Sequence, residues 1–373
     1  MNSLLLLIVV LAVSISVSGV DIKYTPYGDE DFTDVLEAEA DKHHIWQIPQ
    51  FDGSFKSMTE QEAKELTLLS EIPKRIKNMV SHFRNKRRKI RFFLYTQKNV
   101  VNWQEIDMDR PETLHRSFFN SSHVTRIYTH GWLNGVHVIQ SQEMIDSHLM
   151  NGRKEDYNII IVDWSLWSMT YNYYLAHLRT RKVGLKIANF IDWLHSESGL
   201  DFETTHVIGY SMGGHVAGIT GKLVTKGRIN TIIGLDPAMP LFWLKNPENR
   251  IADTDAEYVE TIQTNGGMEG FQFPLGQATF YPNGGSRQPG CKNDFFGACA
   301  HARSVTLFAE AVAKGKDNSF DSLKCEDWQE MKDRKCSEDA QGVKIGDPGN
   351  FGRAKGVYFL NTEGEAPYGI GKF

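Results

Sequence analysis

The feature that most constrains this chain is a short apolar segment that runs directly into a glycine-flanked serine. Residues 205–208 have the composition of a buried strand, and Gly209-Tyr210-Ser211-Met212-Gly213 and a helix-like stretch, 215–224, follow them. A strand-to-helix turn this tight leaves no room for side chains beside the serine, and glycines at 209 and 213 remove them. The turn places Ser211 at a helix N-terminus, where the helix dipole favours developing negative charge.

From Ile90 onward, strand-like and helix-like segments alternate. Apolar residues recur at helical spacing within 183–194, on one of the segments between strands. The predicted strands are 90–95, 124–128, 158–162, 205–208 and 231–235. This alternation predicts an α/β fold with a mostly parallel central sheet flanked by helices.

A nucleophilic serine requires a base, and the base requires an orienting carboxylate. Asp236 follows the apolar strand 231–235, so it should lie at the same sheet edge as Ser211. A strand-end Asp more often only caps a turn, and this alternative stays open. Of thirteen histidines, His301 follows both residues in the chain, as the order Ser…Asp…His requires. We therefore predict Ser211, Asp236 and His301 as the catalytic residues.

The oxyanion of an acyl-transfer intermediate requires two backbone N–H donors. The residue after the nucleophile, Met212, supplies one. The second is assigned to Trp132, in the stretch Thr129-His130-Gly131-Trp132 directly after a predicted strand. In this interpretation His130 is a structural hydrogen-bonding residue and not a second base.

The N-terminus has the pattern of an export signal. Leu4 to Val13 are apolar, and small residues follow up to Gly19, so residues 1–19 are predicted to be a signal peptide. An uncleaved anchor is the alternative. No other stretch is long and apolar enough to span a membrane. We therefore expect a secreted, extracellular protein without a transmembrane segment.

Residues 20–89 form a predicted leader that is distinct from the body at 90–373. The leader is acidic between Asp21 and Asp41, has helical spacing from Glu60 to Arg84 and ends in a basic cluster, Lys86-Arg87-Arg88-Lys89. Three interpretations remain: a solvated surface segment, a pro-segment cleaved at the basic cluster, or a segment attracted to anionic lipid.

The four cysteines fall into two close pairs, which predicts the disulfides Cys291–Cys299 and Cys325–Cys336 and agrees with export. A zinc site is the weaker alternative, because neither pair has a two-residue gap. Asn120-Ser121-Ser122 is a candidate glycosylation site. The formal net charge of −5 gives no reason to expect a nucleic-acid partner.

Five sequence blocks together resemble the pancreatic lipase family of animal lipases. The blocks are Tyr128-Thr129-His130-Gly131-Trp132, Gly209 to His215, Gly234-Leu235-Asp236-Pro237-Ala238, Phe280-Tyr281-Pro282-Asn283-Gly284-Gly285 and Cys299 to Ser304. The resemblance implies an α/β-hydrolase fold, the triad Ser211, Asp236 and His301, and the oxyanion donors Trp132 and Met212. It also implies a lipid substrate at a membrane or micelle surface.

Two short loops and a short C-terminal part make the chain resemble one branch of this family in particular. Cys291 and Cys299 enclose only seven residues, where the family has a lid, and the loop 264–276 is short. Both resemble single-domain insect phospholipase A1 members. After Cys336, 37 residues remain, too few for the C-terminal β-sandwich domain of pancreatic lipases.

The resemblance therefore implies a serine lipid esterase that hydrolyses acyl ester bonds of phospholipids. A triacylglycerol lipase or galactolipase is the alternative within the family. A yolk-type lipid-binding protein without catalysis is the alternative from another class. The presence of all three triad residues favours catalysis.

Pancreatic members of the family bind calcium through acidic groups after the catalytic Asp. In this chain Ala252 stands near one expected carboxylate, while Asp253 and Asp255 remain. This departure argues against a calcium site, and we expect neither a metal nor another cofactor.

Overall fold

The computed structural model describes residues 44–50, 54–69, 89–150 and 155–371. The predicted signal peptide, the acidic part of the leader and residues 84–88 of the basic cluster lie outside the described residues. The described strands are β1 (Trp46–Pro49), β2 (Phe55–Met58), β3 (Arg91–Tyr95), β4 (Gln104–Ile106), β5 (Val124–Thr129), β6 (Tyr157–Asp163), β7 (Thr205–Tyr210), β8 (Thr231–Leu235), β9 (Tyr258–Ile262), β10 (Ala278–Pro282), β11 (Asp321–Cys325), β12 (Glu338–Lys344) and β13 (Gly356–Leu360). The α-helices are α3 (Glu60–Leu69), α5 (Glu112–His115), α6 (Ile139–Leu149), α7 (Ser165–Ser168), α8 (Tyr173–Ser198), α9 (Met212–Leu223), α10 (Ala298–Lys314) and α11 (Trp328–Lys332).

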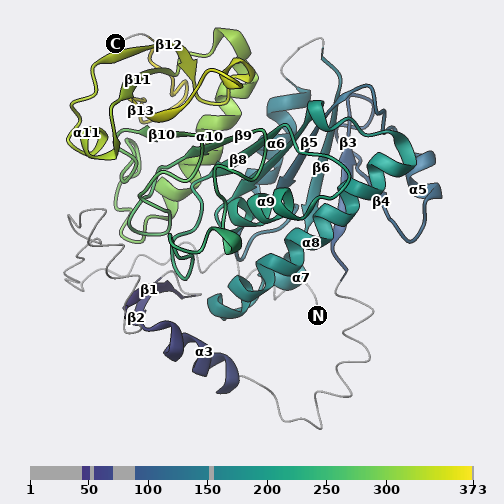
Figure 1. Cartoon of the computed structure of the whole chain (residues 1–373), viewed down its shortest axis with the longest axis horizontal. Helices are drawn as coiled ribbons and strands as arrows, with labels where there is room; N and C mark the ends of the chain where they lie inside the picture. Colours follow the sequence, from purple (N-terminus) through teal and green to yellow (C-terminus); the bar gives the residue numbers. More distant parts are fainter. Residues whose placement is uncertain (1–43, 51–53, 70–88, 151–154, 372–373) are drawn as a thin grey trace.

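One sheet of 11 strands organises the molecule, in the order β12-β11-β13-β10-β9-β8-β7-β5-β6-β3-β4 (Figure 1). The strands from β13 to β6 are parallel to their neighbours. Antiparallel strands extend both edges, β3 with β4 on one side and β11 with β12 on the other. The predicted α/β class with a mostly parallel sheet is confirmed.

Helices cover both faces of the sheet, and each face has its own core. Strand residues alternate between the two: Ile160 and Val162 of β6 belong to the core with Phe190 of α8, whereas Ile159 and Ile161 belong to the core with Val305 of α10. Alternation follows from the period of two in a strand. Because both faces are covered, β6 is apolar almost throughout, as parallel strands between helices usually are.

The strands expected from the sequence are all present. Their boundaries differ from the expected ones by at most two residues: β6 is one residue longer at each end, and β7 ends two residues later. The helical spacing within 183–194 lies inside α8. The expected helix from Glu60 to Arg84 is helical as α3 to Leu69, and its remainder lies outside the described residues. The last strands, β11, β12 and β13, join the central sheet.

The described part of the leader packs against the body of the molecule. Hairpin β1–β2 forms a separate two-stranded sheet, and α3 contacts α8. Trp46, Ile48 and Met58 are each 3% exposed and belong to the core on the α8 side. Strands β1 and β2 of the leader are therefore partly buried, and the three interpretations of residues 20–89 as a whole stay predictions.

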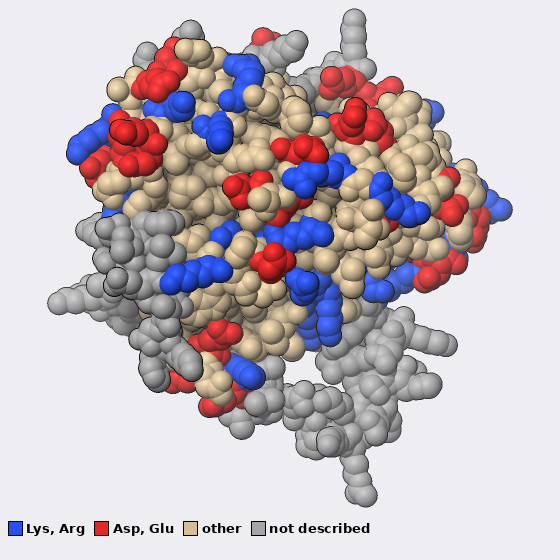
Figure 2. Space-filling view, viewed as in Figure 1, with Lys and Arg blue, Asp and Glu red and all other residues tan. Residues whose placement is uncertain are grey.

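Charged side chains of both signs are interspersed over the face shown in Figure 2, in keeping with the small net charge of −5. Within the described ranges, no helix combines the length and the apolar composition that crossing a bilayer would require.

Candidate active site

The strand-to-helix turn expected around Ser211 is present between β7 and α9. Ser211 has φ 57° and ψ −126°, a strained conformation for a residue with a side chain. A Cβ atom on Gly209 would lie 2.0 Å from the Gly213 carbonyl oxygen, and one on Gly213 would lie 2.2 Å from the Thr129 carbonyl oxygen. The turn therefore closes only with glycine at both positions, and it directs Ser211 to the carboxyl edge of the sheet.

Asp236 and His301 meet at the same edge. Asp236 directly follows β8, and His301 lies in the first turn of α10. The His301 Nδ1–H donates to Asp236 Oδ2 at 2.6 Å. The other carboxylate oxygen accepts from the backbone N–H groups of Thr264 (2.7 Å) and Asn265 (3.1 Å). These bonds fix the ring and leave its Nε2 directed away from Asp236.

Ser211 and His301 line one cavity of about 90 Å³. The His301 Nε2 is buried and has no hydrogen-bond partner among the described residues, so the serine and the imidazole share the cavity without a direct hydrogen bond. Catalytic hydrogen bonds are often long before substrate binds. The structure thus brings the three predicted triad residues together, and their catalytic roles remain proposals.

A further carboxylate, which the sequence analysis missed, faces the free nitrogen of His301. Glu269 Oε2 lies 3.7 Å from His301 Nε2, and the Glu269 side chain is 24% exposed. Burial lowers the pKa of the imidazole, but Glu269 and Asp236 more than offset this and hold the pKa above its ordinary value. Burial raises the pKa of the Glu269 carboxyl, although His301 opposes the rise. No local motif marks Glu269, because the loop between β9 and β10 brings it to the site only in the folded protein.

The segment assigned to the oxyanion site lies against the nucleophile. A Cβ atom on Gly131 would lie 2.8 Å from the Ser211 Cβ, and Trp132 lines the same cavity. Met212 is the first residue of α9, so its N–H belongs to the unpaired first turn of a helix. These positions suit the assignment of Trp132 and Met212 as oxyanion donors, which stays a prediction.

His130 has a structural environment. Its side chain is completely buried, its Nδ1 lies 3.0 Å from the Gly131 carbonyl oxygen, and its Nε2 accepts from the Trp164 N–H at 3.3 Å. Burial lowers the pKa of His130 to about 4. A neutral imidazole held by backbone groups orders the loop that carries Trp132.

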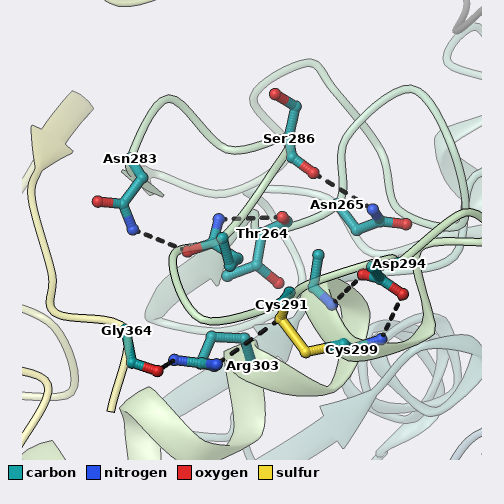
Figure 3. The surroundings of a disulfide bond; sticks show 11 residues. Thr264, Asn265, Asn283, Ser286, Cys291, Asp294, Cys299, Arg303 and Gly364 are labelled. Carbon is teal, nitrogen blue, oxygen red and sulfur yellow. Dashed lines mark hydrogen bonds between the residues drawn. A yellow bond between two sulfur atoms is a disulfide. The ribbon is translucent and has the colours of Figure 1, made fainter.

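Both disulfides expected from the cysteine spacing are present. The loop closed by Cys291–Cys299 leads directly into α10 and thus to His301 (Figure 3). Asp294 in this loop accepts from the N–H groups of Cys299 (3.1 Å) and Ala300 (2.8 Å), two donors in the unpaired first turn of α10. The disulfide and this cap together hold the helix end that carries the imidazole.

Asp255, one of the acidic residues considered for a calcium site, already has a partner in the protein. Asp255 is 2% exposed; its carboxylate is paired with the Lys222 ammonium and accepts from the Ala252 N–H at 2.8 Å. Lys222 also donates to the Arg250 carbonyl oxygen at 3.1 Å. Burial raises the pKa of Asp255 to about 6, even with Lys222 beside it. An ammonium group thus occupies the oxygen ligands that calcium would require.

The candidate glycosylation residue, Asn120, is exposed in the turn before β5. Its side-chain oxygen accepts from the N–H (3.0 Å) and the hydroxyl (2.8 Å) of Ser122. The residue is therefore accessible on the folded surface, and its modification stays a prediction.

The sequence is similar to those of several known lipases. The sequence profile of the family Lipase matches residues 56–368. Lipase member H from Oryctolagus cuniculus is 33% identical over 254 residues, which cover 66% of this chain and 54% of that protein. Pancreatic triacylglycerol lipase from Mus musculus is 31% identical over 301 residues, covering 73% and 63%. Lipoprotein lipase from Rattus norvegicus is 30% identical over 277 residues, covering 68% and 57%.

Similarity to solved structures is much weaker. An esterase from the archaeon Pyrobaculum calidifontis is 13% identical, with 55% of this chain and 78% of that chain covered and a TM-score of 0.26, a value too low to support an argument. The chain spans about half the length of the first curated relatives it matches. Pancreatic triacylglycerol lipase and lipoprotein lipase are among the proteins to which the chain is similar. Because the family profile covers most of the sequence, the chain belongs to the lipase family.

Proposed function

We propose that this protein is a secreted serine esterase that hydrolyses acyl ester bonds of glycerolipids at a membrane or micelle surface. The observation that carries the proposal is the pairing of His301 with Asp236 in the cavity that also contains Ser211. Family membership supports hydrolysis of lipids, and the two disulfides support an oxidising, extracellular compartment.

In the proposed reaction, Ser211 Oγ attacks the acyl carbon while His301 Nε2 takes the hydroxyl proton. The N–H groups of Met212 and Trp132 stabilise the oxyanion of the tetrahedral intermediate. The intermediate releases the alcohol, which takes the proton from His301. A water molecule, deprotonated by His301, then attacks the acyl-enzyme; the Ser211 Oγ–acyl bond breaks, the fatty acid is released and Ser211 Oγ takes the proton back from His301. Asp236 stabilises the imidazolium at both stages.

Phospholipids are the proposed substrates, with hydrolysis of the phospholipase A1 type. The support is the Cys291–Cys299 loop, which encloses only seven residues and has no long apolar surface to contact an oil droplet. We also propose that the protein belongs to the insect branch of the family. In this proposal the chain consists of a leader at 20–89 and a catalytic region at 90–373. Triacylglycerol is the competing substrate, because pancreatic triacylglycerol lipase is among the similar proteins.

The central test is the change Ser211→Ala. We expect fatty-acid release to fall by a factor of at least about 10³, because the nucleophile is lost, while the thermal unfolding midpoint stays close to that of the unchanged protein. Ser198→Ala is the matched control, since among the described residues the Ser198 hydroxyl bonds the Leu194 carbonyl of its own helix α8, at 2.7 Å, and Ser198 does not line the cavity. Undiminished fatty-acid release by the Ser211→Ala protein would refute the assignment.

Substrate class requires a separate comparison. Fatty-acid release from phosphatidylcholine vesicles and from triolein emulsion, measured with the same preparation, should favour the phospholipid. The opposite ratio would assign a triacylglycerol lipase. Failure of a fluorophosphonate to label Ser211 would instead favour a lipid-binding protein without catalysis.

A further inference from the structure

The cavity beside the proposed nucleophile is too small for a lipid. Its volume is about 90 Å³, whereas pockets that bind small molecules usually measure roughly 300–1,000 Å³. Movement of part of its wall would therefore make room for a long acyl chain beside Ser211.

One part of the wall comes from the N-terminal hairpin β1–β2. Pro49, the last residue of β1, lines the cavity together with Ser211 and His301. The preceding alternate residues of β1, Trp46 and Ile48, are each 3% exposed and pack into the core on the α8 side. A segment that begins more than 150 residues before the nucleophile thus forms part of the cavity wall.

Side-chain contacts hold the hairpin on one side of the cavity. The Trp46 ring meets the Trp243 ring edge-on, with centroids 4.8 Å apart. Trp243 lies between β8 and β9, and its indole Nε1–H donates to Glu60 Oε2 of α3 at 2.9 Å. The bond ties the helix that follows the hairpin to the same tryptophan.

On another side, the hairpin reaches the short disulfide loop. Phe55 of β2 contacts Phe296, within the Cys291–Cys299 loop, with ring centroids 6.4 Å apart. Phe296 is 39% exposed. The hairpin therefore contacts two loops, the β8–β9 connection and the disulfide loop. Ala238 of the β8–β9 connection and Pro49 of the hairpin both line the cavity.

The hairpin is attached in a way that permits release. It pairs only with itself and shares no ladder hydrogen bonds with the 11-stranded sheet. An isolated two-stranded hairpin is marginally stable in water, and units that open locally are those with few such connections. Release of this unit would expose Trp46, Ile48 and Met58 at the edge of the core on the α8 side, but it would break no hydrogen bond of the central sheet.

We propose that hairpin β1–β2, held by α3, is a built-in cover that inhibits the active site until it is displaced. The proposal rests on the proposed function, since it assigns regulation to the same serine. The disulfide loop, with seven residues, is too short to cover the cavity. In this proposal the hairpin covers it instead. Displacement removes Pro49 from the cavity wall and opens a path for an acyl chain between Trp243 and Phe296.

The test uses the full chain and two matched variants of α3. Glu60→Ala removes the acceptor of the Trp243 bond, and Glu65→Ala removes an equal charge from an exposed position of the same helix. The first measurement is the labelling rate of Ser211 by a fluorophosphonate with a long alkyl chain. The second is hydrogen exchange of residues 46–58, which reports opening of the hairpin without any reaction at Ser211.

We expect Glu60→Ala to raise both the labelling rate and the exchange rate about tenfold, because a hydrogen bond to a charged group shifts a conformational equilibrium by about that factor. Glu65→Ala should match the unchanged protein. Faster exchange of 46–58 with an unchanged labelling rate would overturn the proposal, because opening would then not expose the nucleophile. Unchanged exchange and labelling would overturn it as well.

A cut chain provides the second test, which does not depend on the folding of a point variant. A specific protease site is inserted after Leu69, the end of α3, and the protein is cleaved and diluted to submicromolar concentration. Loss of the covalent connection lowers the effective concentration of the hairpin, so labelling should rise at least tenfold over the uncut protein. Equal labelling before and after cleavage would overturn the cover. Absence of labelling at Ser211 in every form, with increased exchange of 46–58, would instead refute the proposed function.

Discussion

Two carboxylates approach the His301 ring from its two nitrogens, Asp236 at Nδ1 and Glu269 at Nε2. The first orients the ring, and the second faces the nitrogen that would accept the serine proton. Both stabilise the imidazolium, and together they hold the pKa of His301 above its ordinary value against the effect of burial. The raised pKa of His301 predicts a specific dependence of activity on pH.

The base must be neutral to accept a proton, so activity falls as His301 becomes protonated. Because the pKa is raised, we expect kcat/KM to rise with pH through a midpoint above about 6.5, the ordinary value for histidine. Glu269→Gln removes a charge and keeps the shape. The His301 pKa should then fall, and the rising limb of the pH profile should move to lower pH.

The control is Glu248→Gln, an exposed carboxylate of helix η2 (Pro247–Asn249) that does not line the cavity. Its pH profile should coincide with that of the unchanged protein. A Glu269→Gln profile with the same midpoint as the unchanged protein would show that Glu269 does not act on His301.

The turn between β7 and α9 carries a prediction at the scale of elements. Gly209→Ala places a methyl group 2.0 Å from a backbone oxygen, and backbone atoms cannot move aside as a flexible side chain can. We expect a loss of about 3 kcal/mol or more in the free energy of unfolding, measured by denaturant titration. Gly135→Ala is the control, because its nearest neighbour would be the Ser165 Cβ at 3.5 Å. Equal stability of the two variants would contradict this account of the turn.

The two disulfides allow a comparison between elements. Each closes a short loop, with sequence separations of 8 and 11 residues, so replacing either pair by serines should cost about 2–3 kcal/mol of stability. Their effects on activity should differ, because Cys299 lies two residues before His301. We expect loss of Cys291–Cys299 to lower kcat more than loss of Cys325–Cys336. Equal losses of kcat would exclude a positioning role for the first bond.

Elements with local patterns were predictable, and those built by distant contacts were not. Strands β6 and β8 contain apolar runs, and the Ser211 turn has its own glycines. Strand β9 contains the buried carboxylate of Glu260, which Gly346 and Asn350 satisfy from far along the chain, so its sequence lacks the apolar pattern. Trp46 and Ile48 flank a single polar residue, Gln47, which is too short a pattern to predict strand β1 from the sequence. Glu269 reaches His301 only through tertiary folding.

At the scale of the whole molecule, the pairing of Asp255 with Lys222 predicts indifference to calcium. A chelator such as EDTA should leave the thermal unfolding midpoint and the esterase activity unchanged, because an ammonium group already neutralises the buried carboxylate. Lys222→Met leaves that carboxylate buried without its partner and should cost about 3–5 kcal/mol.

Lys226→Met is the control for this change. Lys226 lies on the surface just beyond α9 and contacts Ser196, so its replacement should alter stability little. A fall in the unfolding midpoint on addition of EDTA, reversed by added calcium, would contradict the predicted indifference.

Lys222 also lies in the last turn of α9, the helix whose first residue follows Ser211. The positive charge that pairs with Asp255 at the end of this helix is therefore part of the polypeptide itself. Neither dilution nor a chelator can remove it. A lipase-family protein built in this way would keep Ser211 aligned in fluids of very different mineral content, and its working range would be set by acidity instead.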